Sequence, residues 1–172
     1  MKIIIILPFK EIYNKRGAGA VSILVNSHLK YSRYKKSTVI FGSKVNDPMN
    51  KNIFYPIKKA RLFTNRSYIK SVESLMENNF NIVVEIHNRP EYFVYLKKIF
   101  PDIKFILFFH NDPTTLKGSE TPNQRNFIAE NCDKIIFLSK WIKNQFIRDT
   151  NINDNPSLIV FYPGIKTIGK FP

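Results

Sequence analysis

Two histidines each stand at the end of an apolar run that has the composition of a buried strand. His87 closes one run, and His110 closes the next one along the chain. A histidine in such a position can accept a proton or hydrogen-bond a sugar hydroxyl near neutral pH. Polar residues follow both histidines and extend the candidate site: Asn88, Arg89, Asn111 and Asp112. Asparagine and aspartate before proline also begin turns for conformational reasons, so a purely structural role stays open.

A second candidate feature is the loop after the first apolar run, which ends in Arg16, Gly17 and Gly19 just before a helical pattern. Glycines at a helix start let the backbone approach a ligand, and the free N–H groups there favour phosphate or sugar oxygens. A dinucleotide-binding fingerprint needs a third glycine where this chain has Ser22, which argues against an NAD site. Two glycines are a weak signal, so a plain flexible connection is the alternative.

The elements that must position these residues alternate along the chain. Apolar runs rich in β-branched residues occupy 2–7, 38–41, 82–86, 103–109, 134–138 and 158–162, with a weaker candidate near 53–55. Helical patterns occupy 18–34, 66–78, 91–100, 123–131 and 139–147. Continuous hydrophobicity is typical of strands covered on both faces, as in a parallel sheet. We therefore predict a single α/β domain with a doubly wound, Rossmann-like parallel sheet and helices on both faces.

That fold also predicts where the site lies. Ligands of open parallel sheets bind outside the carboxyl ends of the strands. Neighbouring strands should bring Gly17, His87 and His110 to one edge of the sheet. Ser139, which follows the run 134–138 and suits the N-cap of the last helical pattern, belongs to the same edge.

Positive charge is concentrated in one part of the chain. Residues 1–70 carry 15 Lys and Arg against 2 acids, a balance of +13, whereas residues 71–172 carry 12 against 11. An AT-rich genome would raise lysine throughout and does not explain why acids are scarce at one end. The charge predicts a surface that meets an anion. Its basic residues alternate with aromatic ones: Lys30, Arg33, Lys35, Lys36, Lys58, Lys59 and Arg61.

This basic, aromatic pattern suits the anionic surface of a membrane. Single-stranded nucleic acid would meet the same pattern by stacking and phosphate contacts, and solvated charge with no partner is the simplest alternative. The sequence has no RNA-binding signature or DNA-reading motif, so we expect no nucleic-acid partner. Cys132 is the single cysteine, which excludes an internal disulfide and, with three histidines, argues against a zinc cluster. We expect a cytoplasmic protein with no metal or bound cofactor, peripheral at most to the inner face of the membrane.

The order of these motifs resembles the N-terminal domain of family 4 glycosyltransferases with the GT-B fold. The glycine loop and the two histidine strand ends carry the likeness, together with the stretches 132–141 and 162–165. The resemblance implies a metal-independent retaining transferase that uses a nucleotide-sugar as co-substrate. The first domain of such an enzyme binds the acceptor, and the second binds the donor. Gly17 and Gly19 would approach the donor phosphates, and His110 would lie beside the transferred sugar.

The resemblance assigns residues 1–163 to the acceptor-side domain and residues 164–172 to the start of a linker. The family's donor-binding glutamates have no counterpart here. Glu77 and Glu85 share their spacing of eight, but one stands near a helix end and the other within a strand, so we interpret that match as accidental. We expect sugar transfer to a glycan or lipid-linked envelope acceptor, in lipopolysaccharide or polysaccharide synthesis, that requires a separate donor-binding domain or partner chain. A non-catalytic glycan- or protein-binding module with the same edge is the alternative.

Overall fold

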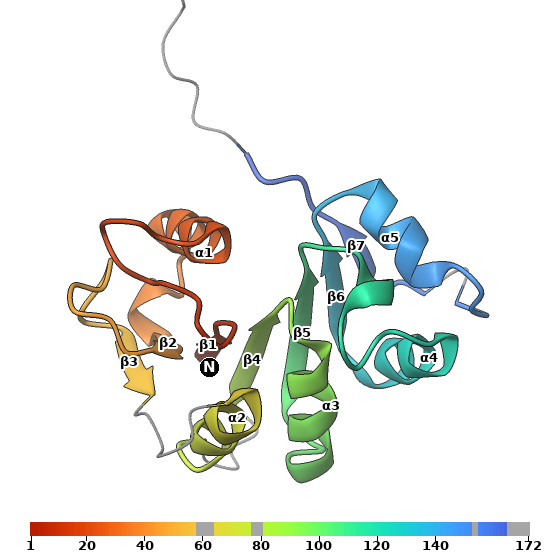
Figure 1. Cartoon of the computed structure of the whole chain (residues 1–172), viewed down its shortest axis with the longest axis horizontal. Helices are drawn as coiled ribbons and strands as arrows, with labels where there is room; N and C mark the ends of the chain where they lie inside the picture. Colours follow the sequence, from red (N-terminus) through yellow and green to blue (C-terminus); the bar gives the residue numbers. More distant parts are fainter. Residues whose placement is uncertain (58–63, 77–80, 153–154, 165–172) are drawn as a thin grey trace, which may run out of the picture.

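The computed structural model describes residues 1–57, 64–76, 81–152 and 155–164, and within them seven strands form one fully parallel sheet in the order β3-β2-β1-β4-β5-β6-β7 (Figure 1). The strands are β1 Lys2–Ile6, β2 Thr38–Ser43, β3 Phe54–Ile57, β4 Ile82–His87, β5 Lys104–Phe109, β6 Lys134–Phe137 and β7 Leu158–Val160. The strand order changes direction between β1 and β4, where a crevice opens in sheets of this kind. The predicted parallel α/β sheet is confirmed.

Helices cover both faces of the sheet. They are α1 Ala20–Tyr31, α2 Asn65–Glu73, α3 Pro90–Ile99, α4 Pro122–Asn131 and α5 Lys140–Ile147, with 3₁₀ turns η1 at Lys35–Ser37 and η2 at Pro113–Thr115. Alternate residues of β1 point to opposite faces. Ile5 therefore packs with Val25 of α1 in one buried cluster, whereas Ile4 lies in the cluster of α2 to α5. Figure 1 shows α1 and α2 on opposite sides of the sheet.

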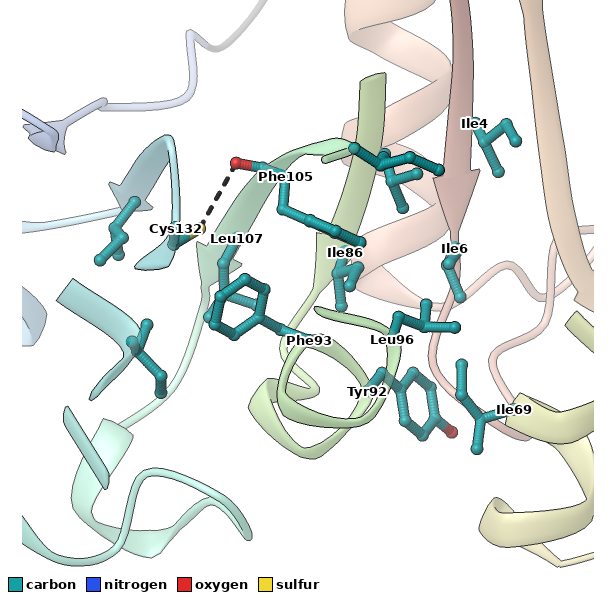
Figure 2. Packing of buried hydrophobic residues seen from close by; sticks show 14 of the residues in the cluster. Ile4, Ile6, Ile69, Ile86, Tyr92, Phe93, Leu96, Phe105, Leu107 and Cys132 are labelled. Atoms are coloured by element: carbon teal, nitrogen blue, oxygen red, sulfur yellow. Dashed lines mark hydrogen bonds between the residues drawn. The ribbon is translucent and has the colours of Figure 1, made fainter. Parts of the chain in front are cut away.

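The larger cluster is rich in aromatic side chains. Figure 2 shows Phe93 and Leu96 of α3 directed toward the strands, and the ring of Tyr92 beside Ile69 of α2. Burying an apolar side chain of this size contributes roughly 1.5–3 kcal/mol. The sulfur of Cys132 lies 3.4 Å from the carbonyl oxygen of Phe105, and burial raises the pKa of this thiol to about 12. Cys132 is therefore a packed core residue.

Two buried tyrosines fix the carboxyl ends of β1 and β2. The hydroxyl of Tyr68, on α2, lies 3.0 Å from the carbonyl oxygen of Leu7 and 3.2 Å from that of Phe41. The hydroxyl of Tyr92, on α3, accepts from the backbone N–H of Phe9 and donates to the side chain of Asn65. Burial raises the pKa of both phenols, so they stay protonated. They hold the loop after β1 against the helices below it.

Element ends differ from the prediction by a few residues. α1 begins at Ala20 because Gly19 is its N-cap, and it ends at Tyr31 because Ser32 is extended. α2 ends earlier than predicted, at Glu73, with Ser74 as its C-cap, and the predicted end at residue 78 lies outside the described residues. Ser139 caps α5 as predicted, since its Oγ accepts from the backbone N–H of Ile142 at 3.2 Å. None of the helices described has both the length and the apolar character required to cross a bilayer.

Arg125 is a fully buried cation whose hydrogen bonds go to backbone carbonyls. Its guanidinium donates to the oxygens of Ser119, Glu120, Phe146 and Arg148 at 2.8–3.0 Å, and the residue is 2% exposed. These bonds tie the segment after η2 to the end of α5, and they hold the chain that follows the end of β5 in one position.

Replacing Arg125 with methionine should lower the free energy of unfolding by about 3–5 kcal/mol, because several buried carbonyls lose their donors. Urea denaturation measures this change. The matched variant Arg148→Met removes a half-exposed guanidinium and should cost less than about 1 kcal/mol. Similar losses for the two variants would contradict the structural role of Arg125.

Candidate functional site

The ends of β4 and β5 hold His87 and His110 in direct contact. Nδ1 of His87 lies 2.9 Å from Nε2 of His110, and the ring centroids are 5.2 Å apart. The contact follows from the pairing of the strands, because β4 and β5 are adjacent and parallel and His87 is level with Phe108. The ring of Phe108 also stacks on His87 at 4.5 Å. The two histidines singled out in the sequence thus form one unit.

Glu85 is the third member of this unit, and the sequence reasoning passed over it. Its Oε1 lies 2.6 Å from Nε2 of His87. Residues two apart in a strand point to the same face, which places Glu85 beside His87. That spacing was the signal available in the sequence. The other member of the glutamate pair, Glu77, lies outside the described residues.

One placement of the hydrogens satisfies both contacts of this chain with His87 neutral. A carboxylate accepts hydrogen bonds only, so Nε2 of His87 carries the hydrogen that points to Glu85. With His87 neutral, its Nδ1 accepts the hydrogen on Nε2 of His110. Nδ1 of His110 then keeps its lone pair. The arrangement prepares His110 to accept a hydrogen bond from a hydroxyl group.

Burial reinforces the neutral state of His110. It lowers the pKa of this imidazole to about 3, and charge on His87 or His28, when either is protonated, is a smaller cause in the same direction. His28, on α1, also has a lowered pKa through burial, and its ring meets Phe161 edge-on at 5.1 Å. The sequence reasoning assigned His28 no part in the site. His28 affects the pKa of His110 because α1 lies over this face of the sheet, where it also meets Phe161 of the segment that follows β7.

Asn88 joins the two strand ends. Its φ of 53° is left-handed, a conformation that asparagine tolerates better than most residues. From there its side-chain oxygen accepts from the backbone N–H groups of His110 and Asn111, both at 3.3 Å. Arg89 donates back to the carbonyl oxygen of Asn88 at 2.9 Å. Asn88 therefore positions the backbone of His110.

The N-terminus of α1 holds a carboxylate of the chain itself. Oε1 of Glu11 accepts from the backbone N–H of Ser22 at 2.9 Å, and negative charge is favoured at this end of a helix. A Cβ on Gly19 would lie 2.1 Å from that oxygen, so the glycine makes room for Glu11. Gly17 has a φ of 75° and faces open space, and Arg16 is exposed. A ligand phosphate at Ser22 would have to displace Glu11.

The remaining predicted residues of the edge divide into exposed and locally bonded ones. Asn111 is exposed. Asp112 accepts from the backbone and hydroxyl of Thr114 at 2.9 and 2.8 Å, and Ser139 is committed to the cap of α5. Asp112 and Ser139 therefore shape the edge through local structure. Across the described residues, no group of three or more His, Cys, Asp or Glu side chains is arranged to hold a metal ion.

The basic patch lies at the opposite edge of the sheet. Lys30 is near the end of α1, and Lys35 and Lys36 form η1, which leads directly into β2. Arg33 lies over the ring of Tyr34 at 4.8 Å. The other predicted members, Lys58, Lys59 and Arg61, lie outside the described residues. Strands of this length separate the two edges by roughly 15–20 Å, so the patch is remote from His110.

The ring of His110 should stay neutral between pH 8 and pH 5, because protonation in the buried site is unfavourable. Its ¹⁵N and ¹³C shifts in an NMR pH titration report this directly. Replacing His87 with glutamine removes one source of repulsion, so the midpoint should rise but stay below 6.5. A wild-type midpoint above about 6 would contradict the assigned hydrogen-bond chain.

Gly19→Ala should destabilise the chain by about 1–2 kcal/mol, because the new methyl group forces Glu11 away from Ser22. In a Glu11→Ala background the same substitution should cost little. The double-mutant cycle, measured by urea denaturation, should therefore give a coupling of about 1 kcal/mol. Additive effects would mean that Glu11 and Gly19 do not interact.

Comparisons with known proteins give a match in structure alone. No protein-family model and no curated protein matches the sequence. Two crystal structures of HepE from Anabaena, one with UDP and one with UDP and glucose, superpose with TM-scores of 0.59 and 0.61 at 12% identity. The matches cover 96% of this chain but only 44% and 45% of HepE, so the chain spans less than half the length of that protein. The likeness shows the fold: a Rossmann-like domain corresponding to one half of a GT-B protein.

Proposed function

We propose that this chain is the acceptor-side half of a glycosyltransferase that moves a sugar from a nucleotide-sugar to a glycan or lipid-linked acceptor. The hydrogen-bonded chain Glu85–His87–His110 at the carboxyl edge of the sheet is the observation that carries the proposal. HepE, whose fold is similar, was crystallised with UDP and with UDP and glucose, so a UDP-sugar is the donor class we favour.

In this reaction His110 would position the transferred sugar. A neutral imidazole with a free lone pair on Nδ1 accepts a hydrogen bond from a sugar hydroxyl and adds no charge near the reacting carbon. Glu85 and His87 hold the ring in that tautomer, as a carboxylate orients a catalytic histidine in other enzymes. Membership of family 4, and with it retention of configuration without a metal, belongs to the proposal and rests on the order of the sequence motifs.

The nucleotide would bind mainly to a second domain. In the described half, Glu11 occupies the N-terminus of α1, and His110 itself is neutral. We propose that the donor-binding wall follows residues 1–163 through a linker at 164–172, or comes from a partner chain. The nine residues of that linker lie almost entirely outside the described residues.

The basic patch supports a peripheral position on the cytoplasmic face of a membrane. Lys30, Arg33, Lys35 and Lys36 are exposed together at the amino edge of the sheet. Lysine and arginine near an anionic leaflet contribute about 1 kcal/mol each. With this edge on the membrane, the histidine edge would face away from it, so the patch fits docking better than direct contact with the acceptor. Envelope polysaccharide or lipopolysaccharide is the acceptor class we propose on this basis.

The test is sugar transfer by the chain purified from its native cells together with any partner that it holds. Radiolabelled UDP-sugars and membrane glycans serve as substrates. His110→Ala should lower kcat by roughly 10²-fold, the usual effect of removing one polar contact to the reacting sugar. His28→Asn, a matched histidine substitution on α1, should have a much smaller effect.

Transfer that survives in His110→Ala would contradict the role of this residue. Binding of glycan with no transfer from any UDP-sugar would instead identify the chain as a non-catalytic binding module.

A further inference from the structure

A pocket of about 340 Å³ opens at the carboxyl ends of β1 and β2, away from the histidine pair. Its floor and walls come from the loop after β1 and from the first residues after β2. Phe9, Ile12 and Val45 supply apolar surface, Lys10 and Lys44 supply two basic side chains, and Ser43 and Glu11 complete the lining. The proposed reaction leaves this pocket without a function.

The backbone is bent in order to place Lys10 at this pocket. Lys10 has a φ of 68°, a left-handed conformation that is unfavourable for a residue other than glycine. Its backbone N–H donates to Oγ of Ser43 at 3.1 Å, which fixes it beside the end of β2 and next to Lys44 in the lining. Strained residues of this kind cluster where ligands are held.

Neighbouring acids do not neutralise these two lysines. Glu11 is bonded to the N-terminus of α1, and Asp47 pairs with Lys15 at 3.3 Å and with Lys51 at 3.7 Å. In the part of the chain that the structure describes, neither Lys10 nor Lys44 has a carboxylate within ion-pair distance. Lys10 lies 5.4 Å from the centroid of the Phe9 ring. Two cations beside apolar walls suit a phosphate or carboxylate attached to a larger body.

We propose that this pocket binds the anionic group, a phosphate or carboxylate, of the acceptor. The inference rests on the proposed function. Strands lie about 4.8 Å apart, so the pocket between the ends of β1 and β2 is roughly 12 Å from His110 at the end of β5. A short oligosaccharide spans that distance, with its reacting end at His110 and its charged end between Lys10 and Lys44.

The donor diphosphate fits this pocket less well than the acceptor does. The crevice at the change in strand order lies between β1 and β4, on the other side of β1. The carboxylate of Glu11 also stands at the start of α1. The edge therefore offers two separate sites, the neutral imidazole of His110 and the two basic side chains of Lys10 and Lys44.

Binding of glucose 1-phosphate and glucuronic acid, followed by amide shifts in NMR titrations, tests the pocket without any need for catalysis. The double variant Lys10→Gln/Lys44→Gln should weaken binding at least about tenfold, a change of about 1.4 kcal/mol. Lys35→Gln/Lys36→Gln removes the same charge at the amino edge and should change it less than about twofold. Any binding of neutral glucose should be the same in the wild type and in both double variants.

Vesicles of phosphatidylcholine with and without phosphatidylglycerol distinguish a lipid headgroup from a soluble sugar as the source of the anion. In a Lys35→Gln/Lys36→Gln background, which weakens the amino-edge patch, a lipid source predicts that the added Lys10 and Lys44 substitutions lower sedimentation with anionic vesicles further. A soluble source predicts loss of the sugar-acid probes alone. The proposed anion site would be refuted if the Lys10/Lys44 and Lys35/Lys36 variants changed the binding of every probe equally, or if the wild type bound none of the probes. Probe binding that depends on Lys10 and Lys44, in a protein without sugar transfer, would refute the proposed function and leave the anion site standing.

Discussion

The contact between two buried imidazoles determines the chemistry of this edge. His87 has no exposed surface, and both of its ring nitrogens are bonded to protein groups, to Glu85 on one side and to His110 on the other. Such a residue cannot rotate without breaking buried hydrogen bonds, so it fixes the tautomer of its neighbour. The contact depends in turn on the parallel pairing of β4 with β5, because a shift of one residue would turn the histidines to opposite faces.

The same edge distributes charge in a regular way. Near β4 and β5, Glu85, His87 and His110 are hydrogen-bonded to one another, and His110 remains neutral. At the start of α1, Glu11 uses the favourable end of the helix and requires a glycine at position 19. Beyond β1, Lys10 and Lys44 remain without acidic partners among the described residues. A ligand that lies along this edge would therefore meet neutral acceptors at one end and cations at the other.

The sequence was sufficient to predict the parallel sheet and the proximity of His87 and His110. It was insufficient to predict the contacts that determine the hydrogen bonding and the neutral state of His110. The apolar runs that end in His87 and His110 predict neighbouring strand ends, because the carboxyl ends of parallel strands lie at the same edge of a sheet. The i, i+2 spacing places Glu85 on the same face of the strand as His87, but it does not predict the hydrogen bond between them. Glu11 and Ser22 meet through the path of a loop, which composition does not encode. The excess of lysine likewise predicted a single basic patch. In the structure α1 runs from one edge of the sheet to the other, so Lys30 lies at the amino edge and Lys10 at the carboxyl edge.

The most direct measurement is a crystal structure of the chain, with any natural partner, bound to its acceptor glycan and an unreactive UDP-sugar analogue. The proposed role of His110 predicts that a hydroxyl of the transferred sugar lies at hydrogen-bonding distance, about 2.7–3.0 Å, from Nδ1 of His110, with the contact between His87 and His110 preserved. A glycan bound away from the carboxyl edge, or Nδ1 of His110 turned onto a protein group, would contradict it.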